Sequence, residues 1–546
     1  MRSGRGRPFG RVGLLLAAVA PALTLTLVPQ PASAQPAPPA QTQLRTQAQV
    51  LGDGQGAGRE QDHVPGVERY LDSVRGNPAA LRQFLFDLPK GGDLHTHLPG
   101  AVSVELLIHL AAGDGMCIDT VTYTAGAGPC GGTRRPAADA ETDPVFRTQV
   151  IGAWSMEGFV PSPSESGHDH FFATFFKVGA IVATHSADMA AEVVQKAAVQ
   201  HEVYMESMTL QQFPAIIELA QRVTPSTDFA AMRAQVLAGG DMARIVAAAR
   251  AELDADQARY RSLLHCGTPQ ALAGCDVVLR WIHTVLREFP PNVVFTSMVA
   301  GFELAEADSR YVAVNMVQPE DGPISQRDYH LHMQMLDYLR GVYHRSHITL
   351  HAGELTPALS PPADLRFHIR EAILLGHAER IGHGVDVLGE DNPQQLLHLM
   401  ATRHVMVESP LVSNAQILEV SGPDHPFPVY RQFHVPIALA TDDEGVSRTD
   451  MTAQFEMAVN NYQLSYRDLV ELTRTSLEHA FLPGASLWRA PDDFRPALAC
   501  AHDLLGGPQP SPSCGLLLAG SAKAALQWRQ ESLLRAFELR YDQAAA

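Results

Sequence analysis

Residues 348–354 read Ile-Thr-Leu-His-Ala-Gly-Glu, a short apolar strand that ends in a histidine, a small-residue turn and a carboxylate. If the last side chains of this strand project into a pocket, His351 can bind a metal ion while Glu354 stands beside it with a proton to give. One such strand end is weak evidence for a functional site, because many strands end in polar loops. Four other strand-like runs in this chain end in the same way.

Those four runs are Gly92-Asp-Leu-His-Thr-His97, Arg380-Ile-Gly-His-Gly384, His404-Val-Met-Val-Glu-Ser-Pro410 and Pro436-Ile-Ala-Leu-Ala-Thr-Asp-Asp443. Side chains two residues apart on a strand share a face, so His95 and His97 can bind one ion together. Helical patterns at 364–375, 393–402 and 429–433 separate the later strands. This alternation, with polar residues at the strand ends, predicts an α/β fold of the (β/α)8 TIM-barrel type with its chemistry on one rim.

The first 34 residues predict a secretory signal peptide. An arginine-containing start precedes an apolar run over 12–28 and the small residues Ala32-Ser33-Ala34. No adjacent arginine pair and no following cysteine is present, so we expect a Sec-type signal and a secreted or periplasmic protein. An uncleaved membrane anchor is the alternative. Residues 35–66, rich in Gln, Ala, Pro and Gly, predict a disordered linker, and 67–546 predict the folded domain.

The charge balance limits the class of partner. The chain has 41 basic and 59 acidic residues, a formal net charge of −18, and removal of the four leader arginines gives about −22. So acidic a surface repels phosphate backbones, which argues against nucleic acid and favours a neutral small molecule of nucleoside size. No later run is long and apolar enough to span a membrane, so we expect no membrane association after signal cleavage. The sequence does not indicate an oligomeric state.

Six cysteines fall into three close pairs, Cys117 with Cys130, Cys266 with Cys275 and Cys500 with Cys514. Six cysteines allow 15 connectivities, and proximity favours this one. An exported chain meets an oxidising compartment, so we predict three local disulfides. A zinc site is the alternative, but no pair has C-x-x-C spacing.

Residues 85–105 read Leu-Phe-Asp-Leu-Pro-Lys-Gly-Gly-Asp-Leu-His-Thr-His-Leu-Pro-Gly-Ala-Val-Ser-Val-Glu. This stretch resembles the opening of the adenosine deaminase family, whose first strand carries PK-x-x-L-H-x-H-L; here one extra residue separates Pro89-Lys90 from Leu94. The later motifs HAGE (351–354), RIGHG (380–384), SPLVSN (409–414) and TDD (441–443) are similar to the family's strand ends, in the same order. The leader and residues 166–172 look more like secreted bacterial members, with some likeness to adenosine deaminase growth factors.

These residues predict one divalent metal ion, most simply zinc, with a position left for water. Its ligands would be His95, His97, His351 and Asp442. Zinc lowers the pKa of bound water to ~7. His383 and Asp442 would orient that water and accept its proton, while Glu354 would protonate the purine ring so that ammonia leaves. The resemblance assigns Glu354 to purine N1 and Asp443 to N7.

The residues that would recognise the substrate depart from the family pattern. Gln318 takes the place of a glycine whose backbone meets purine N3, Pro99 stands where an aspartate contacts the sugar, and Glu444 replaces a common proline. The resemblance places Phe171 and Phe175 over the pocket, where they could form an apolar lid. His168 and His170 form a second H-x-H, which we expect in a loop rather than at a metal.

The predicted function is deamination of adenosine, and of 2′-deoxyadenosine, to the inosine product and ammonia. Another adenine-containing substrate is the first alternative. A two-metal amidohydrolase would need a lysine or carboxylate on the fourth strand, and residues 313–318 contain none. A non-catalytic secreted binding or signalling protein on the same fold is the second alternative, but it would not require the whole polar set.

Two insertions are predicted in the barrel, at about 111–187 and 214–291, the second with helices at 229–237 and 242–253. Helices at 451–462 and 466–480 would close the barrel. A last helix over 521–541 would begin at Ser521 as its N-cap.

Overall fold

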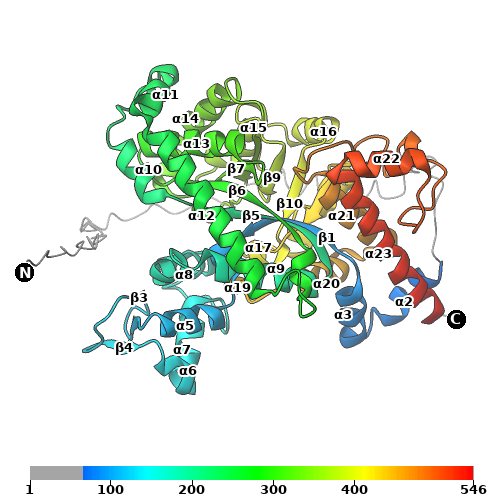
Figure 1. Ribbon diagram of the computed structural model, residues 1–546, viewed down its shortest axis with the longest axis horizontal. Helices are drawn as coiled ribbons and strands as arrows, with labels where there is room; N and C mark the ends of the chain where they lie inside the picture. Colours follow the sequence, from blue (N-terminus) through cyan, green and yellow to red (C-terminus); the bar gives the residue numbers. More distant parts are fainter. Residues whose placement is uncertain (1–64, 545–546) are drawn as a thin grey trace, which may run out of the picture.

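The computed structural model describes residues 65–544, which form a nearly closed barrel of eight parallel strands (Figure 1). The strands follow one another around the sheet in chain order: β1 (Gly91–His97), β5 (Glu202–Thr209), β6 (Val278–Leu286), β7 (Tyr311–Val317), β8 (His347–Ala352), β9 (Arg380–His383), β10 (Met406–Ser409) and β11 (Ile437–Leu439). The (β/α)8 prediction is confirmed. The expected signal peptide and all of the expected linker except residues 65 and 66 lie outside the described residues, as do the last two residues.

The strands are buried on both faces, as parallel strands covered by helices must be. All eight residues of β5 are buried, including Glu206, which pairs with Arg380 of β9. Strand β1 meets the segment after β11 at a bridge between Thr96 and Asp442, where Asp442 N–H donates to the His95 carbonyl at 2.9 Å. The backbone N–H and the hydroxyl of Thr441 also donate to the Asp93 carboxylate across this seam. This seam brings the first and last strand ends together.

Helices connect the strands around the barrel. They are α9 (Ser186–Val199), α13 (Pro291–Ala307), α14 (Pro323–Arg340), α15 (His368–Leu374), α16 (Pro393–Arg403), α17 (Leu411–Ile417), α18 (Phe427–Gln432), α19 (Glu444–Ser447), α20 (Met451–Tyr462) and α21 (Tyr466–Glu478). The predicted helices at 364–375, 393–402 and 429–433 correspond to α15 with a preceding 3-10 turn, α16 and α18. Helix α17, which begins within the SPLVSN motif and extends to Ile417, was not predicted.

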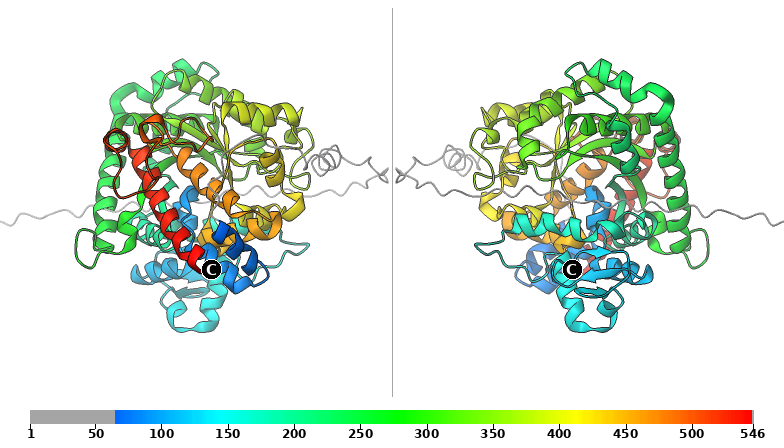
Figure 2. Two further views of the ribbon diagram at one scale, coloured as in Figure 1. Left: turned by 90° about the vertical axis from the view of Figure 1, so that its right-hand side faces the viewer. Right: turned by 90° about the vertical axis from the view of Figure 1, so that its left-hand side faces the viewer.

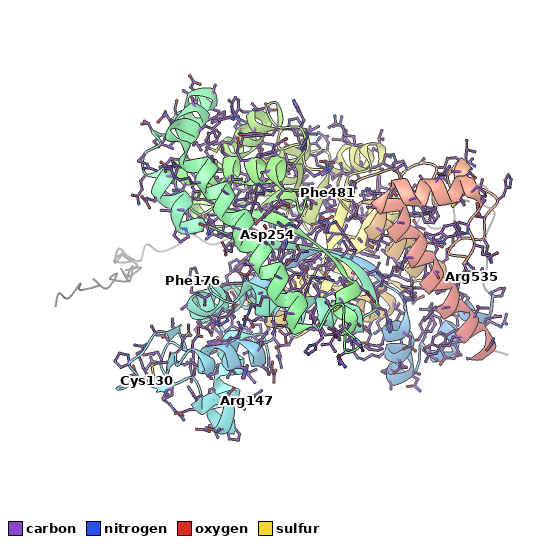
Figure 3. The ribbon with its side chains drawn as sticks, in the orientation of Figure 1. Cys130, Arg147, Phe176, Asp254, Phe481 and Arg535 are labelled. Carbon is purple, nitrogen blue, oxygen red and sulfur yellow. A yellow bond between two sulfur atoms is a disulfide. The ribbon has the colours of Figure 1, made fainter. Side chains whose placement is uncertain are left out.

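The segment between β1 and α9 forms a part that projects from the barrel (Figures 1 and 3). It contains α4 (Leu98–Ala101), α5 (Val104–Gly113), α6 (Asp139–Thr142), α7 (Pro144–Trp154) and α8 (Gly167–Val182), with a small antiparallel sheet of β2 (Cys117–Asp119), β3 (Ala125–Gly126) and β4 (Arg134–Pro136). The Cys117–Cys130 disulfide joins this sheet to its loop, and Phe176 of α8 is 79% exposed. This segment overlaps the insertion expected at about 111–187 and begins earlier, directly after β1.

The residue range predicted for the second insertion was too long. Residues 213–263 contain α10 (Phe213–Ala220), α11 (Phe229–Leu237) and α12 (Asp241–Leu263). Helix α11 matches the helix predicted at 229–237, α12 extends ten residues beyond the helix predicted at 242–253, and α10 was not predicted. The expected range of 214–291, however, also contains β6, the third barrel strand. Arg280 and His283 interrupt its apolar pattern, and His283 is nevertheless fully buried beneath Gly301 of α13.

The two ends of the described chain pack together. Helices α2 (Pro65–Val74) and α3 (Pro78–Asp87) lie beside the final helix α23 (Ala522–Ala544) (Figure 2). The rings of Tyr70 and Tyr541 contact each other there, with 4.8 Å between their centroids. Ser521 caps α23 as predicted, accepting from Ala524 N–H. Within residues 65–544 no helix is both long and apolar enough to cross a membrane.

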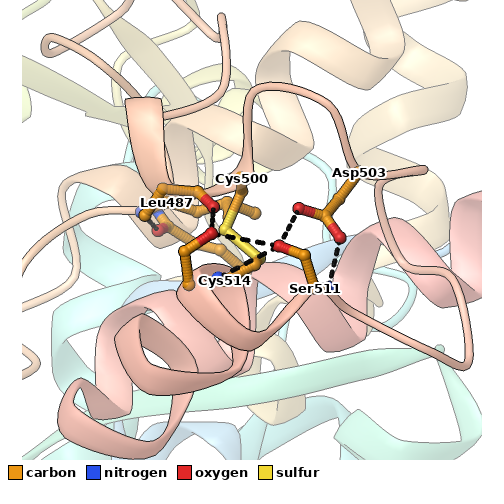
Figure 4. Close-up of a disulfide and its surroundings, with 8 residues drawn as sticks. Leu487, Cys500, Asp503, Ser511 and Cys514 are labelled. Carbon is orange, nitrogen blue, oxygen red and sulfur yellow. Dashed lines mark hydrogen bonds between the residues drawn. A yellow bond between two sulfur atoms is a disulfide. The ribbon is translucent and has the colours of Figure 1, made fainter.

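All three predicted disulfides are confirmed. The last, Cys500–Cys514, fastens the loop before α22 (Pro512–Gly520), where Asp503 accepts hydrogen bonds from the backbone and side chain of Ser511 (Figure 4). Every cysteine in the described chain is paired.

Candidate active site

Four of the predicted residues meet at the carboxyl-terminal end of the barrel. His95 and His97 come from β1, His351 from β8, and Asp442 from the seam after β11, and one donor atom from each lies within 4.8 Å of the others. His97 Nε2 is 3.2 Å from His351 Nε2 and 3.2 Å from Asp442 Oδ1, and His95 Nε2 is 3.6 Å from the same oxygen. The structure therefore brings the predicted metal-binding set together.

These distances fit a small divalent cation. At zinc–ligand distances of about 2.0–2.1 Å, two ligands of a tetrahedral ion lie about 3.3 Å apart. Asn315 Oδ1 accepts from the backbone N–H of His351, so it also accepts from Nδ1–H of that ring at 2.9 Å and leaves Nε2 as an unprotonated donor. His95 Nε2 is buried and lacks a hydrogen-bond partner among residues 65–544.

The electrostatics of the site also favour a cation. Burial would raise the pKa of Asp442, but the adjacent His95 and His97 rings hold it well below the usual range, so the carboxylate is ionised. Burial and the neighbouring His95 lower the pKa of His351 well below that of free imidazole. Burial would lower the pKa of His95, but Asp442 and Glu408 raise it to about 10. The ionised Asp442 carboxylate thus places negative charge where the histidine nitrogens converge.

A buried charge network supports His95 from behind. Glu408 of β10 accepts from His95 Nδ1–H at 2.6 Å, from Arg380 Nε at 2.6 Å and from Thr349 Oγ1 at 2.9 Å. Arg380 in turn donates to Glu206 at 2.6 Å. This carboxylate–histidine arrangement fixes the ring orientation and leaves Nε2 to face the site.

Glu354, His383 and Asp442 form a second group at the same rim. His383 donates from Nδ1 to Asn414 Oδ1 at 2.8 Å, and its Nε2, which has no hydrogen-bond partner in the described chain, lies 3.9 Å from Asp442 Oδ2. The Glu354 carboxylate is 3.6 Å from the His383 ring, and burial raises its pKa. The group therefore combines a proton acceptor at His383 with a carboxyl that tends to keep its proton.

Asp443 is buried against the turn that follows β1. Burial and the adjacent Asp442 raise its pKa well above the usual range, and its Oδ1 has no hydrogen-bond partner within residues 65–544. A Cβ atom at Gly100 would lie 1.6 Å from that oxygen, so only glycine allows this approach. Asp443 is thus free to donate a hydrogen bond to a ligand.

Gln318, at the end of β7, adopts a left-handed backbone with φ of +85°. Glycine favours this conformation, which agrees with its predicted place in the pattern. Its side-chain oxygen accepts from Glu288 N–H at 2.9 Å. The side chain is therefore committed within the protein, and the backbone is the part left for a ligand.

Helix α8 lies over the loops that leave the strand ends. Phe171 is buried with Val385, Ile417 and Val446, and Phe175 packs partly buried on the same cluster. Our expectation of a loop at His168 and His170 was wrong, because Ser166 caps α8 and both histidines lie in its first two turns. His168 Nε2 lies 3.1 Å from Asp321 in the loop after β7, and His170 contacts Glu165.

Sequence reasoning missed the residues that hold the central groups. Glu408, Asn315, Ser413 and Asn414 each bond one of the predicted residues, with Ser413 Oγ 2.5 Å from Asp442 Oδ2. All four occur in runs that had been recognised as strands or motifs. Alternation along those runs could have found Glu408 and Asn315, since side chains two apart share a face.

A cleft of about 470 Å³ opens at the other end of the barrel, between the amino-terminal strand ends and the segment after α21. Its lining includes Arg340, Arg403, Lys523 and Phe481, the last labelled in Figure 3. None of the histidine or carboxylate donors described above lines it. The carboxyl-terminal rim, where those groups converge, is therefore the candidate active site.

An eight-stranded parallel barrel with histidine and carboxylate donors at its carboxyl-terminal rim is a TIM-type barrel built around a candidate metal centre. The family model described as "Adenosine deaminase" matches residues 159–487, more than half of the sequence. The chain belongs to the adenosine deaminase family.

Individual relatives are more distant. Adenosine deaminase of Mycobacterium avium (strain 104) is 26% identical over 226 residues, 39% of this chain and 57% of that protein. Adenosine deaminase of Enterococcus faecalis (strain ATCC 700802 / V583) is 33% identical over 136 residues, 25% of this chain and 37% of that protein. The match with the first of these thus spans little more than half of that relative's length.

Solved structures align over more of the chain at lower identity. Adenine deaminase from Arthrobacter aurescens aligns with 72% of this chain and 94% of its own, at 16% identity and a TM-score of 0.44. Arabidopsis ADAL complexed with IMP aligns with 73% of this chain and 94% of its own, at 20% identity and a TM-score of 0.48.

Proposed function

We propose that this protein is a metal-dependent purine nucleoside deaminase that converts adenosine, and 2′-deoxyadenosine, to the corresponding inosine and ammonia. The observation that carries the proposal is the junction of two groups at one rim. Three histidines and an ionised aspartate converge within 4.8 Å, and a buried glutamate with a raised pKa lies beside them. Membership of the adenosine deaminase family supports the same assignment.

The donor set supports one divalent ion, with zinc as the simplest choice, held by His95, His97, His351 and Asp442. When bound, such an ion supplies Lewis acidity, which makes water acidic enough to react near neutral pH. Glu408 and Asn315 already bond the Nδ1 atoms of His95 and His351. These contacts orient both rings and leave their Nε2 atoms available for the ion.

The chain's own groups can then move the protons. Glu354 donates its proton to purine N1, so that the ring accepts the electrons as water adds to the neighbouring carbon. His383 Nε2, aided by Asp442 Oδ2, accepts the proton that the attacking water loses. Return of a proton to the amino group lets the C–N bond break and ammonia leave. Asp443, with its raised pKa, donates a hydrogen bond to N7 and orients the ring.

The residues expected to recognise the sugar differ from the family pattern. Pro99 cannot supply the carboxylate that family members place there, and Gln318 offers a left-handed backbone rather than a glycine. Phe171 and Phe175 on α8 are proposed as the apolar lid. A different adenine-containing substrate therefore stays as the alternative within the same chemistry.

We also propose that the protein works outside the cytoplasm. Three disulfides close local loops, and such bonds persist in oxidising compartments. The negatively charged composition supports a small-molecule partner over nucleic acid.

The decisive experiment follows the loss of absorbance in the adenine band with adenosine as substrate. Wild-type turnover should disappear with chelator and return with zinc. Glu354→Gln should abolish turnover while metal content stays normal, because glutamine cannot donate an acid proton. Glu379→Gln, which removes a carboxylate at the opposite end of β9, should retain wild-type activity. Full activity in Glu354→Gln, or none in metal-loaded wild type with any adenine compound, would refute the proposal.

A further inference from the structure

Glu320 lies three residues beyond β7, 1% exposed, and both of its carboxylate oxygens are used inside the protein. Oε1 accepts the backbone N–H of Gly353 at 3.1 Å, and Oε2 accepts the backbone N–H of Glu354 at 2.8 Å. Burial would raise the pKa of Glu320, but hydrogen bonding with His368 lowers it, so the carboxylate is ionised. One charged side chain thus binds two consecutive amides of the loop that carries Glu354.

His368 holds Glu320 in place. This residue begins α15, is fully buried, and donates from Nδ1 to Glu320 Oε1 at 2.6 Å. The Tyr329 ring of α14 stacks on it at 3.8 Å between centroids with planes 9° apart. Tyr329 Oη also donates to the His368 carbonyl at 2.8 Å. The imidazole therefore has little freedom to turn away from Glu320.

The Gly353–Glu354 loop needs an external partner. Strand pairing between β8 and β9 ends at Ala352, and Gly353 then turns into a left-handed conformation with φ of +75°. Both residues are buried, so their N–H groups would otherwise be left without water or a strand partner. A buried amide without a partner costs free energy comparable to a lost hydrogen bond.

We infer that Glu320 and His368 are positioning residues that clamp the backbone of Glu354, and so fix where its carboxyl lies relative to His383 and Asp442. This inference rests on the proposed function, since Glu354 is the proton donor there. Neither positioning residue belongs to the proposed metal-binding or substrate-binding set. Their effect is transmitted through the two backbone hydrogen bonds.

Three variants separate positioning from general stability. Glu320→Gln keeps the volume but has one acceptor oxygen, so it can satisfy only one of the two amides. His368→Leu removes the donor to Glu320, whereas the side-chain amide of His368→Asn can donate from a place near the original Nδ1. Glu390→Gln is the matched control. Glu390 is a buried carboxylate that accepts the N–H groups of Ile369 and Arg370 of α15 and does not bond Glu354.

The first readout is hydrogen exchange of the Gly353 and Glu354 amides, resolved by NMR or by fragment mass spectrometry. We expect exchange at least tenfold faster in Glu320→Gln and His368→Leu, near wild type in His368→Asn, and unchanged in Glu390→Gln. This readout does not depend on turnover. Unchanged exchange in both disruptive variants would overturn the clamp even if the wild type proved inactive.

The second readout is the split between kcat and KM with adenosine. A small displacement of a catalytic group can cost about 100-fold, so we expect kcat to fall 10- to 100-fold in Glu320→Gln and His368→Leu. KM should stay within about threefold, metal content should be unchanged, and His368→Asn should recover most of kcat. Equal losses in His368→Asn and His368→Leu, or a comparable loss in Glu390→Gln, would show a role in stability alone. Absence of wild-type turnover would refute the proposed function separately.

Discussion

Replacing Glu408 with glutamine tests how the buried network tunes the proposed metal centre. In the wild type one oxygen of Glu408 accepts from His95, and the other accepts from Arg380 and Thr349. Glutamine has a single oxygen. If that oxygen faces His95, the amide N–H₂ meets Arg380 donor to donor; if it faces Arg380, His95 loses its acceptor and its tautomer is no longer fixed. Either arrangement weakens the hold on the His95 ring.

The magnitude follows from what is lost. Removing an outer-shell partner of a metal-binding histidine costs about 10- to 100-fold in metal affinity, or about 1.4–2.7 kcal/mol. Breaking a buried ion pair costs about 3–5 kcal/mol of stability, and we expect the lower end because Arg380 keeps its 2.6 Å contact with Glu206. Turnover at saturating zinc should fall less than affinity does, since the four donors all remain.

The assay is competition for Zn²⁺ against a chromophoric chelator, with the melting temperature measured in excess zinc and in chelator. Glu379→Gln serves as the control, because Glu379 pairs with His347 at the amino-terminal ends of the strands. A dissociation constant within twofold of wild type for Glu408→Gln, in protein that stays folded, would refute the reasoning that the network tunes the site.

Three further outcomes are expected. Gly100→Ala places a methyl group 1.6 Å from Asp443 Oδ1, so steady-state turnover should fall at least tenfold with zinc content unchanged, whereas Gly113→Ala, which meets nothing within 4 Å, should behave as wild type. Replacing Cys500 and Cys514 with alanine opens a loop of 14 residues and should cost about 3 kcal/mol by calorimetry; a loss under 1 kcal/mol would contradict this. Burial lowers the pKa of His283 to about 4. The unfolded chain therefore binds more protons between pH ~6.5 and 4, and stability should fall by about 3 kcal/mol as pH drops through this window. His283→Asn should flatten that slope in urea titrations at several pH values, and an identical slope in the variant would count against it.

The strand ends were predictable because they combine two local signals, an apolar run and a polar terminus. His95, His351 and Asp442 could be assigned to one rim from the sequence alone, since parallel strands end at the same edge. Strand β6 was assigned to a predicted insertion because Arg280 and His283 interrupt its apolar pattern, as residues that face solvent would. His283 is instead buried under Gly301, and only a contact distant in sequence reveals this.

The supporting residues were harder to predict for a related reason. Glu408 in β10 accepts hydrogen bonds from residues of β1, β8 and β9, none of which is near it in the chain. Glu320 likewise acts on a loop more than 30 residues away. Local pattern also failed at His168, where Gly and Ser nearby suggested a loop although Ser166 is a helix cap. A helix start and a turn use the same polar residues, so composition alone does not separate them.

The position of the candidate metal centre at the seam between β1 and β11 links metal binding to closure of the barrel. His95 and His97 stand on one side of the seam, Asp442 on the other, and the two sides meet at the bridge between Thr96 and Asp442. A cation bound by residues on both sides would link β1 to the segment after β11 across this seam. Occupancy of the centre and closure of the barrel then form one coupled equilibrium, in which ligand binding to the closed form shifts the balance by mass action. Withdrawal of the ion would thus remove the proposed chemistry and also weaken the closure of the barrel.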